Sequence, residues 1–398
     1  MNNLIVLAAV FVAVSIAVAP AFAQSKAAAH DVPEGAASYE KSKRCSACHP
    51  AIYKEWDSSM HSKSSLHKDP AHKAMYEAFL DDMKKAGKEG GYHCASCHMP
   101  MPENLKELMQ GTENPDTNRW REEEGVGCAF CHRVQTIVEG KDRNMFSINK
   151  DGEYVSSNPS GKAPHAVGGN ELYAGGQMCM GCHSHMTNQD GIAICSMKEE
   201  GQGNCQSCHM AKKEGPPSIE SDKDDHFSHE MGGGHNMEML NKAIEVKATL
   251  SETGTVGKTL NIEITNKTAH SFPSTMPMRM AYLKVAAYDS KKKAIFRNYQ
   301  KNPMEDKNAV FMKAFKGGDE VGVPAWKAKE VAFDTRLING ETRSFSYEIP
   351  NDGLKTITVE VIYRLFPKQA IDKYPALKEP LGSANDKDIV IYKKEFHY

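Results

Sequence analysis

The sequence has little net charge of either sign and no repeated long hydrophobic runs. Its 398 residues carry 49 Lys and Arg against 51 Asp and Glu, which leaves a formal net charge of -2. A protein dedicated to nucleic acid usually needs a basic surface, so we expect no nucleic-acid partner. Hydrophobic residues make up 40% of the chain, and they are not gathered into a series of bilayer-length segments. The composition therefore excludes a protein that crosses a membrane many times.

The N-terminal segment lacks the Lys or Arg that commonly opens a secretory signal. It nevertheless has an apolar stretch from Leu4 to Ala19, and Ala21-Phe22-Ala23 then gives a small-x-small pattern. We predict a signal peptide over residues 1–23 and export to the periplasm or the cell surface. The alternative is an uncleaved anchor, and only then do we expect the chain to be held at a membrane. No Cys lies near the predicted cleavage site, which argues against a lipoprotein.

The 11 Cys are an odd number and cannot form a closed disulfide framework. Ten of them form five Cys-x-x-Cys-His units. Two thiols at this spacing can add to the two vinyl groups of one haem, and the next His is then delivered to the iron. We predict five haem c groups, attached at Cys45, Cys48, Cys94, Cys97, Cys128, Cys131, Cys179, Cys182, Cys205 and Cys208. The predicted proximal iron ligands are His49, His98, His132, His183 and His209.

Zinc sites and redox-active thiol pairs also use paired Cys residues, but both fit this chain less well. A structural zinc site joins two Cys-x-x-Cys units, and five is an odd number of units. Thioredoxin-like motifs lack the fixed His and do not recur along one chain. Cys195 is left over, and we expect a small buried thiol there. The alternative for Cys195 is a reactive or intermolecular thiol.

Distal ligands decide whether each iron is open or closed. An iron with one His can bind a small molecule, whereas a second His leaves it mainly to electron transfer. We predict distal ligands at His61, His165, His229 and His235, with His93 as the candidate for the fifth and His185 as the alternative. His229 and His235 flank a glycine run, which lets the backbone approach a flat macrocycle closely. We expect His67, His72 and His226 to lie at the surface or behind a ligand, and Met99 and Met210 to pack against a haem edge.

Residues 24–235 contain all the predicted haem chemistry. Helical stretches there are short, near Ala51–Met60, Pro70–Ala86 and Pro102–Met109, and a hairpin is expected over Phe146–Tyr154. Apolar runs are too few to build a core, so we expect the haems to supply it. The chain without haem should then fail to fold in this region.

Residues 236–398 have a different pattern of apolar and polar residues and contain no Cys. Apolar and polar residues alternate in runs separated by turn residues, beginning at Ile244, Leu260, Leu283, Phe345 and Ile357. This pattern predicts an antiparallel β-sandwich of immunoglobulin-like type, and the whole chain is therefore predicted to be α+β. His270 falls in a predicted loop, where we expect it to pack. The alternative is that it reaches a haem across the domain boundary.

Several stretches resemble the multihaem cytochromes c of the cytochrome c554/c-prime type. They are CSACHPAIYKEW…SSMH, GVGCAFCH, CMGCH, GNCQSCHM and HEMGGGHNMEML, and ITNKTAHSFPSTMPMRMAYLKVAAYD resembles the β domain of many such chains. The resemblance implies an exported electron-transfer protein, in some members with catalytic haems. It adds weight to His61, His229 and His235 as distal ligands. Pentahaem nitrite reductases carry a Cys-x-x-Cys-Lys motif, and none of the five motifs here ends in Lys.

The sequence thus predicts an electron carrier that serves redox protein partners, such as a quinol dehydrogenase, another cytochrome or a terminal reductase. One alternative is a reductase of a small nitrogen or sulfur oxyanion at an open haem. Another is a polymerising extracellular cytochrome, for which a homo-oligomer is expected. Each haem adds two propionates, so the loaded protein should be more acidic than its sequence and should favour basic partner surfaces.

Overall fold

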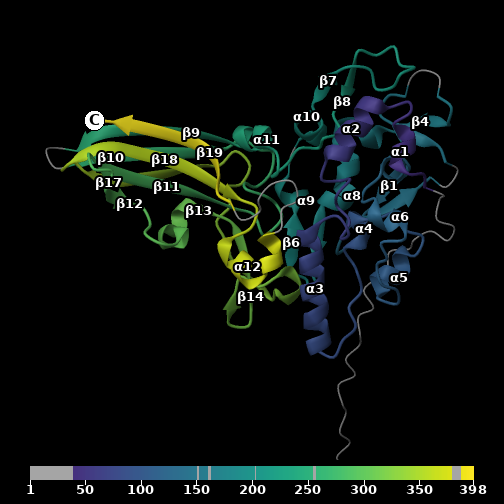
Figure 1. Ribbon diagram of the computed structural model, residues 1–398, viewed down its shortest axis with the longest axis horizontal. Coiled ribbons are helices and arrows are strands. Elements are labelled where there is room, and N and C mark those ends of the chain that lie inside the picture. Colours follow the sequence, from purple (N-terminus) through teal and green to yellow (C-terminus); the bar gives the residue numbers. More distant parts are fainter. Residues whose placement is uncertain (1–38, 150–151, 160–162, 202, 254–256, 379–386) are drawn as a thin grey trace, which may run out of the picture.

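The chain forms two regions that pack side by side (Figure 1). The computed structural model describes residues 39–149, 152–159, 163–201, 203–253, 257–378 and 387–398. The predicted signal peptide, residues 1–23, lies outside the described residues. Within them, no helix has both the length and the apolar character of a membrane span. Short helices dominate the N-terminal region and antiparallel strands the C-terminal one, so the chain is α+β, as predicted.

The N-terminal region is built from short helices joined by irregular chain. They are α1 (Ser42–Cys45), α2 (Pro50–Ser58), α3 (Pro70–Lys85), α4 (Ala95–His98), α5 (Leu105–Gln110), α6 (Trp120–Glu123), α7 (Cys128–Cys131), η1 (Glu171–Cys179), α8 (Met180–His183), α9 (Met197–Glu200) and α10 (Cys205–His209), whereas the next helix, α11 (Met237–Lys242), packs with the C-terminal region. Helix α3 begins where predicted, because Pro70 opens it and the Asp69 side chain accepts from the backbone N–H of His72. The third predicted helix starts at Leu105, later than expected.

Four small strand pairs support the irregular chain between these helices. They are β1 (Val134–Val138) with β2 (Met145–Ile148), β3 (Tyr154–Ser156) with β4 (Val167–Gly169), β5 (His185–Thr187) with β6 (Ala193–Ser196), and β7 (Lys212–Glu214) with β8 (Asp225–Phe227). The hairpin expected over Phe146–Tyr154 is wrong. Phe146 pairs back with Ile137, and Tyr154 pairs in parallel with Val167. The strand that contains Phe146 and the strand that contains Tyr154 each pair with a strand outside residues 146–154, and they do not pair with each other.

Three antiparallel sheets make up the C-terminal region. The first has the order β17-β10-β9, with bounds Thr342–Pro350, Gly257–Asn266 and Ile244–Thr253. The second has the order β12-β11-β18-β19, with bounds Ala294–Arg297, Met280–Asp289, Leu354–Arg364 and Ile389–His397, and β13 (Val310–Phe311) also pairs with β11. The third has the order β15-β14-β16, with bounds Glu320–Val321, Lys313–Gly317 and Glu330–Asp334. Short helical turns complete the region: η2 (Pro303–Ala309), η3 (Ala325–Lys327), α12 (Lys368–Lys373) and η4 (Pro375–Lys378).

The two larger sheets share one hydrophobic core. Ile262 of β10, Leu283 of β11 and Val359 of β18 all belong to it and are almost fully buried. All five alternating runs that the sequence suggested lie in strands of these sheets. Each such aliphatic side chain contributes about 1.5–3 kcal/mol of burial free energy.

The N-terminal region has no comparable core among its described residues. Its buried apolar side chains form small separate groups, one around Phe130 and Met101 and another around Tyr92 and Leu108. The two regions meet through a further apolar group, in which Ile194 of β6 packs with Phe315 of β14. The core of the C-terminal region is therefore continuous and made mainly by its own strands, with Ala71 of α3 packed into it, and that of the N-terminal region is divided.

Candidate functional site

Each Cys-x-x-Cys-His motif forms a single helical turn. In the first three motifs the backbone N–H of the His donates to the carbonyl of the first Cys, at 2.8 to 3.0 Å. The second, fourth and fifth motifs lie in or at α4, α8 and α10. A helical turn brings residues three apart onto one face, so both thiols point to the same side. None of the ten motif Cys forms a disulfide bond.

The five turns lie against one another. Thiols of different motifs lie close enough to interact in three pairs, which are Cys45 with Cys128, Cys97 with Cys182, and Cys179 with Cys205. Cys131 of the third motif lies close enough to Cys179 and Cys182 of the fourth to affect both electrostatically. The first motif therefore adjoins the third, the third adjoins the fourth, and the fourth adjoins the second and the fifth. Motif spacing along the chain contains no hint of this order.

Three of the predicted proximal imidazoles face a second imidazole across a gap. The ring centres are 6.2 Å apart for His183 and His61, 6.2 Å for His132 and His229, and 6.4 Å for His209 and His270. The angles between the ring planes differ widely, at 65°, 23° and 14°. Metal–imidazole bonds of about 2 Å on either side of one ion place two ring centres roughly 6 Å apart at any such angle. The distance between ring centres is nearly the same in the three pairs, whereas the angle between the ring planes varies. This combination fits an iron between the two rings better than it fits direct packing of one ring on the other.

In several of the predicted and facing His residues, Nδ1 already makes a hydrogen bond, which leaves Nε2 as the nitrogen that could bind iron. Nδ1 donates to a backbone carbonyl in His49 (Pro217, 2.7 Å), His132 (Val155, 2.8 Å), His209 (Gly232, 2.6 Å), His229 (Phe227, 2.8 Å) and His270 (Ser271, 3.0 Å). The Nδ1 of His61 lies 2.6 Å from the sulfur of Met231. Metal-bound His residues commonly donate their other N–H to such an acceptor, which fixes the tautomer and leaves Nε2 for the metal.

Burial keeps the imidazoles of His61 and His229 uncharged. It lowers the pKa of His61 to about 4, helped by the neighbouring His183, and the pKa of His229 to about 4, helped by His132. The neutral imidazole is the form that binds a metal. These residues therefore fit haem iron in position, tautomer and charge.

Three of the predicted distal ligands do not face a proximal ring. Among the described residues, His165, His235 and His93 each lie outside stacking distance of the proximal imidazoles. The His165 ring packs 4.8 Å from that of Tyr154, and the His93 carbonyl accepts from Arg143. The Nδ1 of His235 is buried without a hydrogen-bond partner among the described residues. These three residues remain predictions.

The surroundings of His98 differ from those of the other motifs. Its ring centre lies 4.1 Å from that of His72, too close for an iron between them. Both Nδ1 atoms lie 3.2 Å from the Ser64 carbonyl, and the His72 Nε2 lies 3.3 Å from the Tyr92 hydroxyl. His72 therefore lies beside His98, not opposite it. Burial lowers the pKa of His98 to about 3.

Sequence reasoning expected His270 to pack in its loop and kept a haem across the domain boundary as the alternative, and the structure places its ring facing that of His209. No local pattern could have shown this, because the two residues come from different regions. His226 and His185 behave as supports. His226 contacts Gly215 and Glu55 through its two nitrogens, and His185 contacts Ser184 and Gly140.

Two comparisons with known proteins agree with this geometry, and no curated protein matches the chain. Residues 44–133 match the family model of cytochrome c554 and c-prime. The chain is also similar to the solved structure of a penta-heme cytochrome c552 from Thermochromatium tepidum, with 25% identity and a TM-score of 0.75. That similarity covers 90% of this chain and 99% of the other, so it extends through both regions. With five Cys-x-x-Cys-His turns gathered in one cluster, the chain belongs to the multihaem cytochrome c family.

Proposed function

We propose that this chain is an exported electron carrier that holds five haem c groups and passes electrons between redox protein partners. The observation that carries the proposal is the close approach of the five motif turns, from the first to the third and fourth and on to the second and fifth. Covalent haem supplies a reversible one-electron centre at each motif. The chain sets the spacing of the centres, their ligands and their burial.

The ligand set follows from the ring geometry. The ten motif Cys hold the macrocycles, and His49, His98, His132, His183 and His209 are the proximal ligands. His61 serves the fourth motif and His229 the third. His165, His235 and His93 remain the candidates for motifs that lack a facing imidazole among the described residues.

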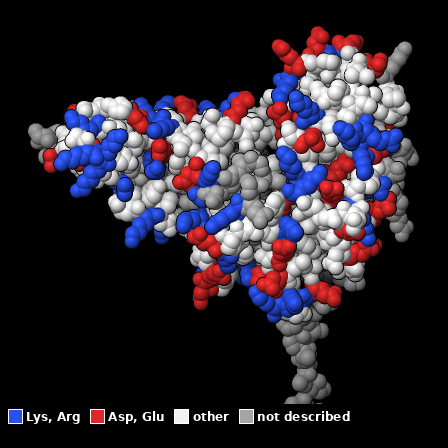
Figure 2. Space-filling model, viewed as in Figure 1, with Lys and Arg blue, Asp and Glu red and all other residues white. Residues whose placement is uncertain are grey.

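We extend the proposal to location, domains and partners. Residues 1–23 direct export to the periplasm or cell surface, 24–235 form the haem domain, and 236–398 form an immunoglobulin-like sandwich. Figure 2 shows acidic and basic side chains interspersed over the visible face of both regions. Two propionates per haem would tip this balance towards negative charge, which suits partners with basic docking surfaces.

A reductase of a small nitrogen or sulfur oxyanion is the second candidate. It is favoured by the first and second motifs, because no described imidazole faces His49 or His98 at an iron-spanning distance. An iron open at either place could bind such an anion. A polymer in which another copy supplies the missing ligands would explain the same observation.

An EPR spectrum of the isolated, oxidised protein separates these functions. The carrier predicts only low-spin signals that nitrite, hydroxylamine and sulfite leave unchanged, with five haems per chain by pyridine haemochrome assay. A high-spin signal that shifts with any of these ligands would contradict the carrier and favour the reductase. The polymer would be favoured if dilution turned low-spin signals high-spin while sedimentation showed dissociation to a monomer.

A further inference from the structure

The loop that carries His270 belongs to the C-terminal region, yet its imidazole faces the fifth motif. The ring planes of His270 and His209 are nearly parallel, at 14°, and their centres lie 6.4 Å apart. The Nδ1 of His270 donates to the Ser271 carbonyl at 3.0 Å, and that of His209 donates to the Gly232 carbonyl at 2.6 Å. In each ring Nδ1 is thus engaged, and no hydrogen bond from a described residue reaches Nε2.

We propose that His270 is the distal iron ligand of the fifth haem, so that the β region closes a haem site of the N-terminal region. The inference rests on the proposed function, since it requires a haem at Cys205 and Cys208. It gives the β region a chemical part in electron transfer. The potential and the ligation of the fifth haem then depend on how the two regions are joined.

The backbone around His270 is fixed by a buried amide. The side chain of Asn266, which is 1% exposed, donates to the His270 carbonyl at 2.7 Å and to the Leu337 carbonyl at 3.0 Å. The Thr268 hydroxyl donates to the same His270 carbonyl at 2.6 Å. Two backbone hydrogen bonds then pair Phe272 with Leu337. A ligand held this firmly is oriented before any iron is bound.

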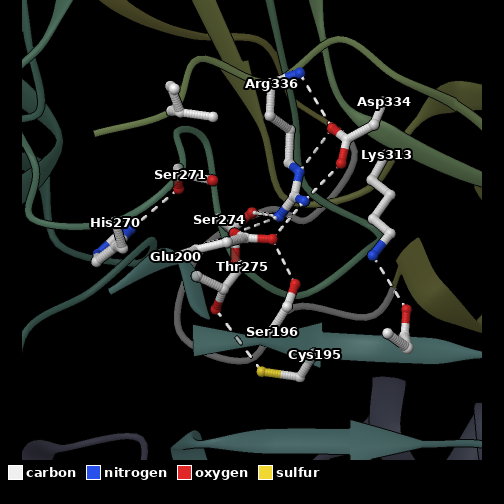
Figure 3. Close-up of polar contacts among 12 residues, drawn as sticks. Cys195, Ser196, Glu200, His270, Ser271, Ser274, Thr275, Lys313, Asp334 and Arg336 are labelled. Carbon is white, nitrogen blue, oxygen red and sulfur yellow. Dashed lines mark hydrogen bonds and ion pairs between the residues drawn. The ribbon is translucent and has the colours of Figure 1, made fainter. Parts of the chain in front are cut away.

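An ion-pair cluster ties the same loop to the chain just before the fifth motif (Figure 3). Arg336 is buried and binds Glu200 of α9 through both terminal nitrogens, at 3.0 and 2.8 Å. It also donates to the Ser274 carbonyl at 3.0 Å and to Asp334 at 2.6 and 2.8 Å. Glu200 lies shortly before Cys205, and Ser274 shortly after His270. One guanidinium thus connects the two segments that would hold the fifth haem from opposite sides.

The variant His270→Ala, prepared as the haem-loaded full chain, tests the proposal by EPR. We expect one of the five haems to turn high-spin. Near-parallel imidazole planes give a rhombic low-spin signal, so the lost intensity should come from a rhombic component and not from a strongly anisotropic one. Added imidazole should enter the vacated place and restore the low-spin signal. A purely structural His would not be replaced in this way.

His397→Ala is the matched control, because His397 lies in β19 of the same region and its side chain is 70% exposed. It should leave every signal unchanged. A spectrum of His270→Ala identical to that of the parent overturns the proposal, and so does a high-spin signal that imidazole cannot remove. A pyridine haemochrome count below five in the parent would instead contradict the proposed function, so the two failures are distinguishable.

His270→Met covers the case in which the alanine variant does not fold. Replacing His by Met as an axial ligand raises the reduction potential. We therefore expect one of five potentials to rise in a spectroelectrochemical titration while the other four stay in place. Five unchanged potentials would overturn the assignment.

Discussion

At the scale of single residues, the second ring nitrogen separates ligands from supports. His61 and His229 have one nitrogen engaged and the other free, whereas His226 contacts protein groups through both. A free Nε2 on a ring whose tautomer is fixed is what an iron requires. A His without that freedom holds the backbone around the site. His226 acts in this way through Glu55, because Glu55 contacts His226 and also accepts a hydrogen bond from the backbone N–H of His229.

His61→Ala should turn the haem of the fourth motif high-spin. The planes of His61 and His183 meet at 65°, so the signal that disappears from the EPR spectrum should be a strongly anisotropic low-spin one. His185→Gln is the control, because His185 is engaged at both nitrogens. If His61→Ala keeps all its low-spin intensity, His61 is not a ligand.

The haem-binding residues were predictable only where they are local in sequence. Cys45, Cys48 and His49 follow from a spacing that the haem vinyl groups dictate. His61 lies in the same part of the chain as this first motif and yet faces His183 of the fourth. His270 comes from a different region altogether. Such pairings are decided by how distant turns pack, and no periodicity along the chain records that packing.

At the scale of elements, the junction between α9 and the end of β16 holds the two regions in register. Asp334 ends β16, Arg336 follows it, and Glu200 ends α9. Burial raises the pKa of Asp334, but hydrogen bonds and charge from Arg336 outweigh it and leave the pKa below its usual range. The alternating runs recognised in the sequence did not include β16, and nothing in that pattern predicted an ion pair between regions. The ion-pair partner of a charged loop residue depends on the tertiary arrangement of the strands, and the local sequence does not contain that information.

Asp334→Asn should lower the free energy of unfolding by about 1–2 kcal/mol at neutral pH, because Arg336 loses a charged partner while part of the site stays open to solvent. The folded pKa of Asp334 is depressed, so its contribution is complete above the ordinary Asp value of about 4 and is lost as the pH falls through the folded value. The difference between parent and variant in urea unfolding should therefore shrink on acidification. A difference that is constant with pH would show that the Asp334 charge does not matter.

Glu330→Gln provides the comparison on the same strand. Glu330 pairs with Lys316 at 3.1 Å, and its side chain is 60% exposed. An exposed pair of this kind contributes little, because water screens it. Its urea midpoint should match that of the parent at both pH values.

At the scale of the whole molecule, the two regions are stabilised by different means. The β region has one continuous core that joins both of its larger sheets. The N-terminal region has only small separate clusters among its described residues, which fits the prediction that haem fills the space between the motif turns. The strand pattern of the first kind of core can be recognised in a sequence. A core filled by haem can be recognised in the sequence only from a shortage of apolar runs and an excess of Cys and His.

Replacing all ten motif Cys with Ala therefore gives a chain in which only one region should fold. The β region should keep its sheet signal in circular dichroism and slow amide hydrogen exchange in β10, β11 and β18, because their buried side chains contact one another and no haem. The N-terminal region should lose protection from exchange and become the first target of limited proteolysis, with cuts before α11. The haem-loaded parent should resist the same protease in both regions. Protection of α2 in the Cys-free chain equal to that in the parent would contradict a haem-dependent core, since that helix would then be stable on protein contacts alone.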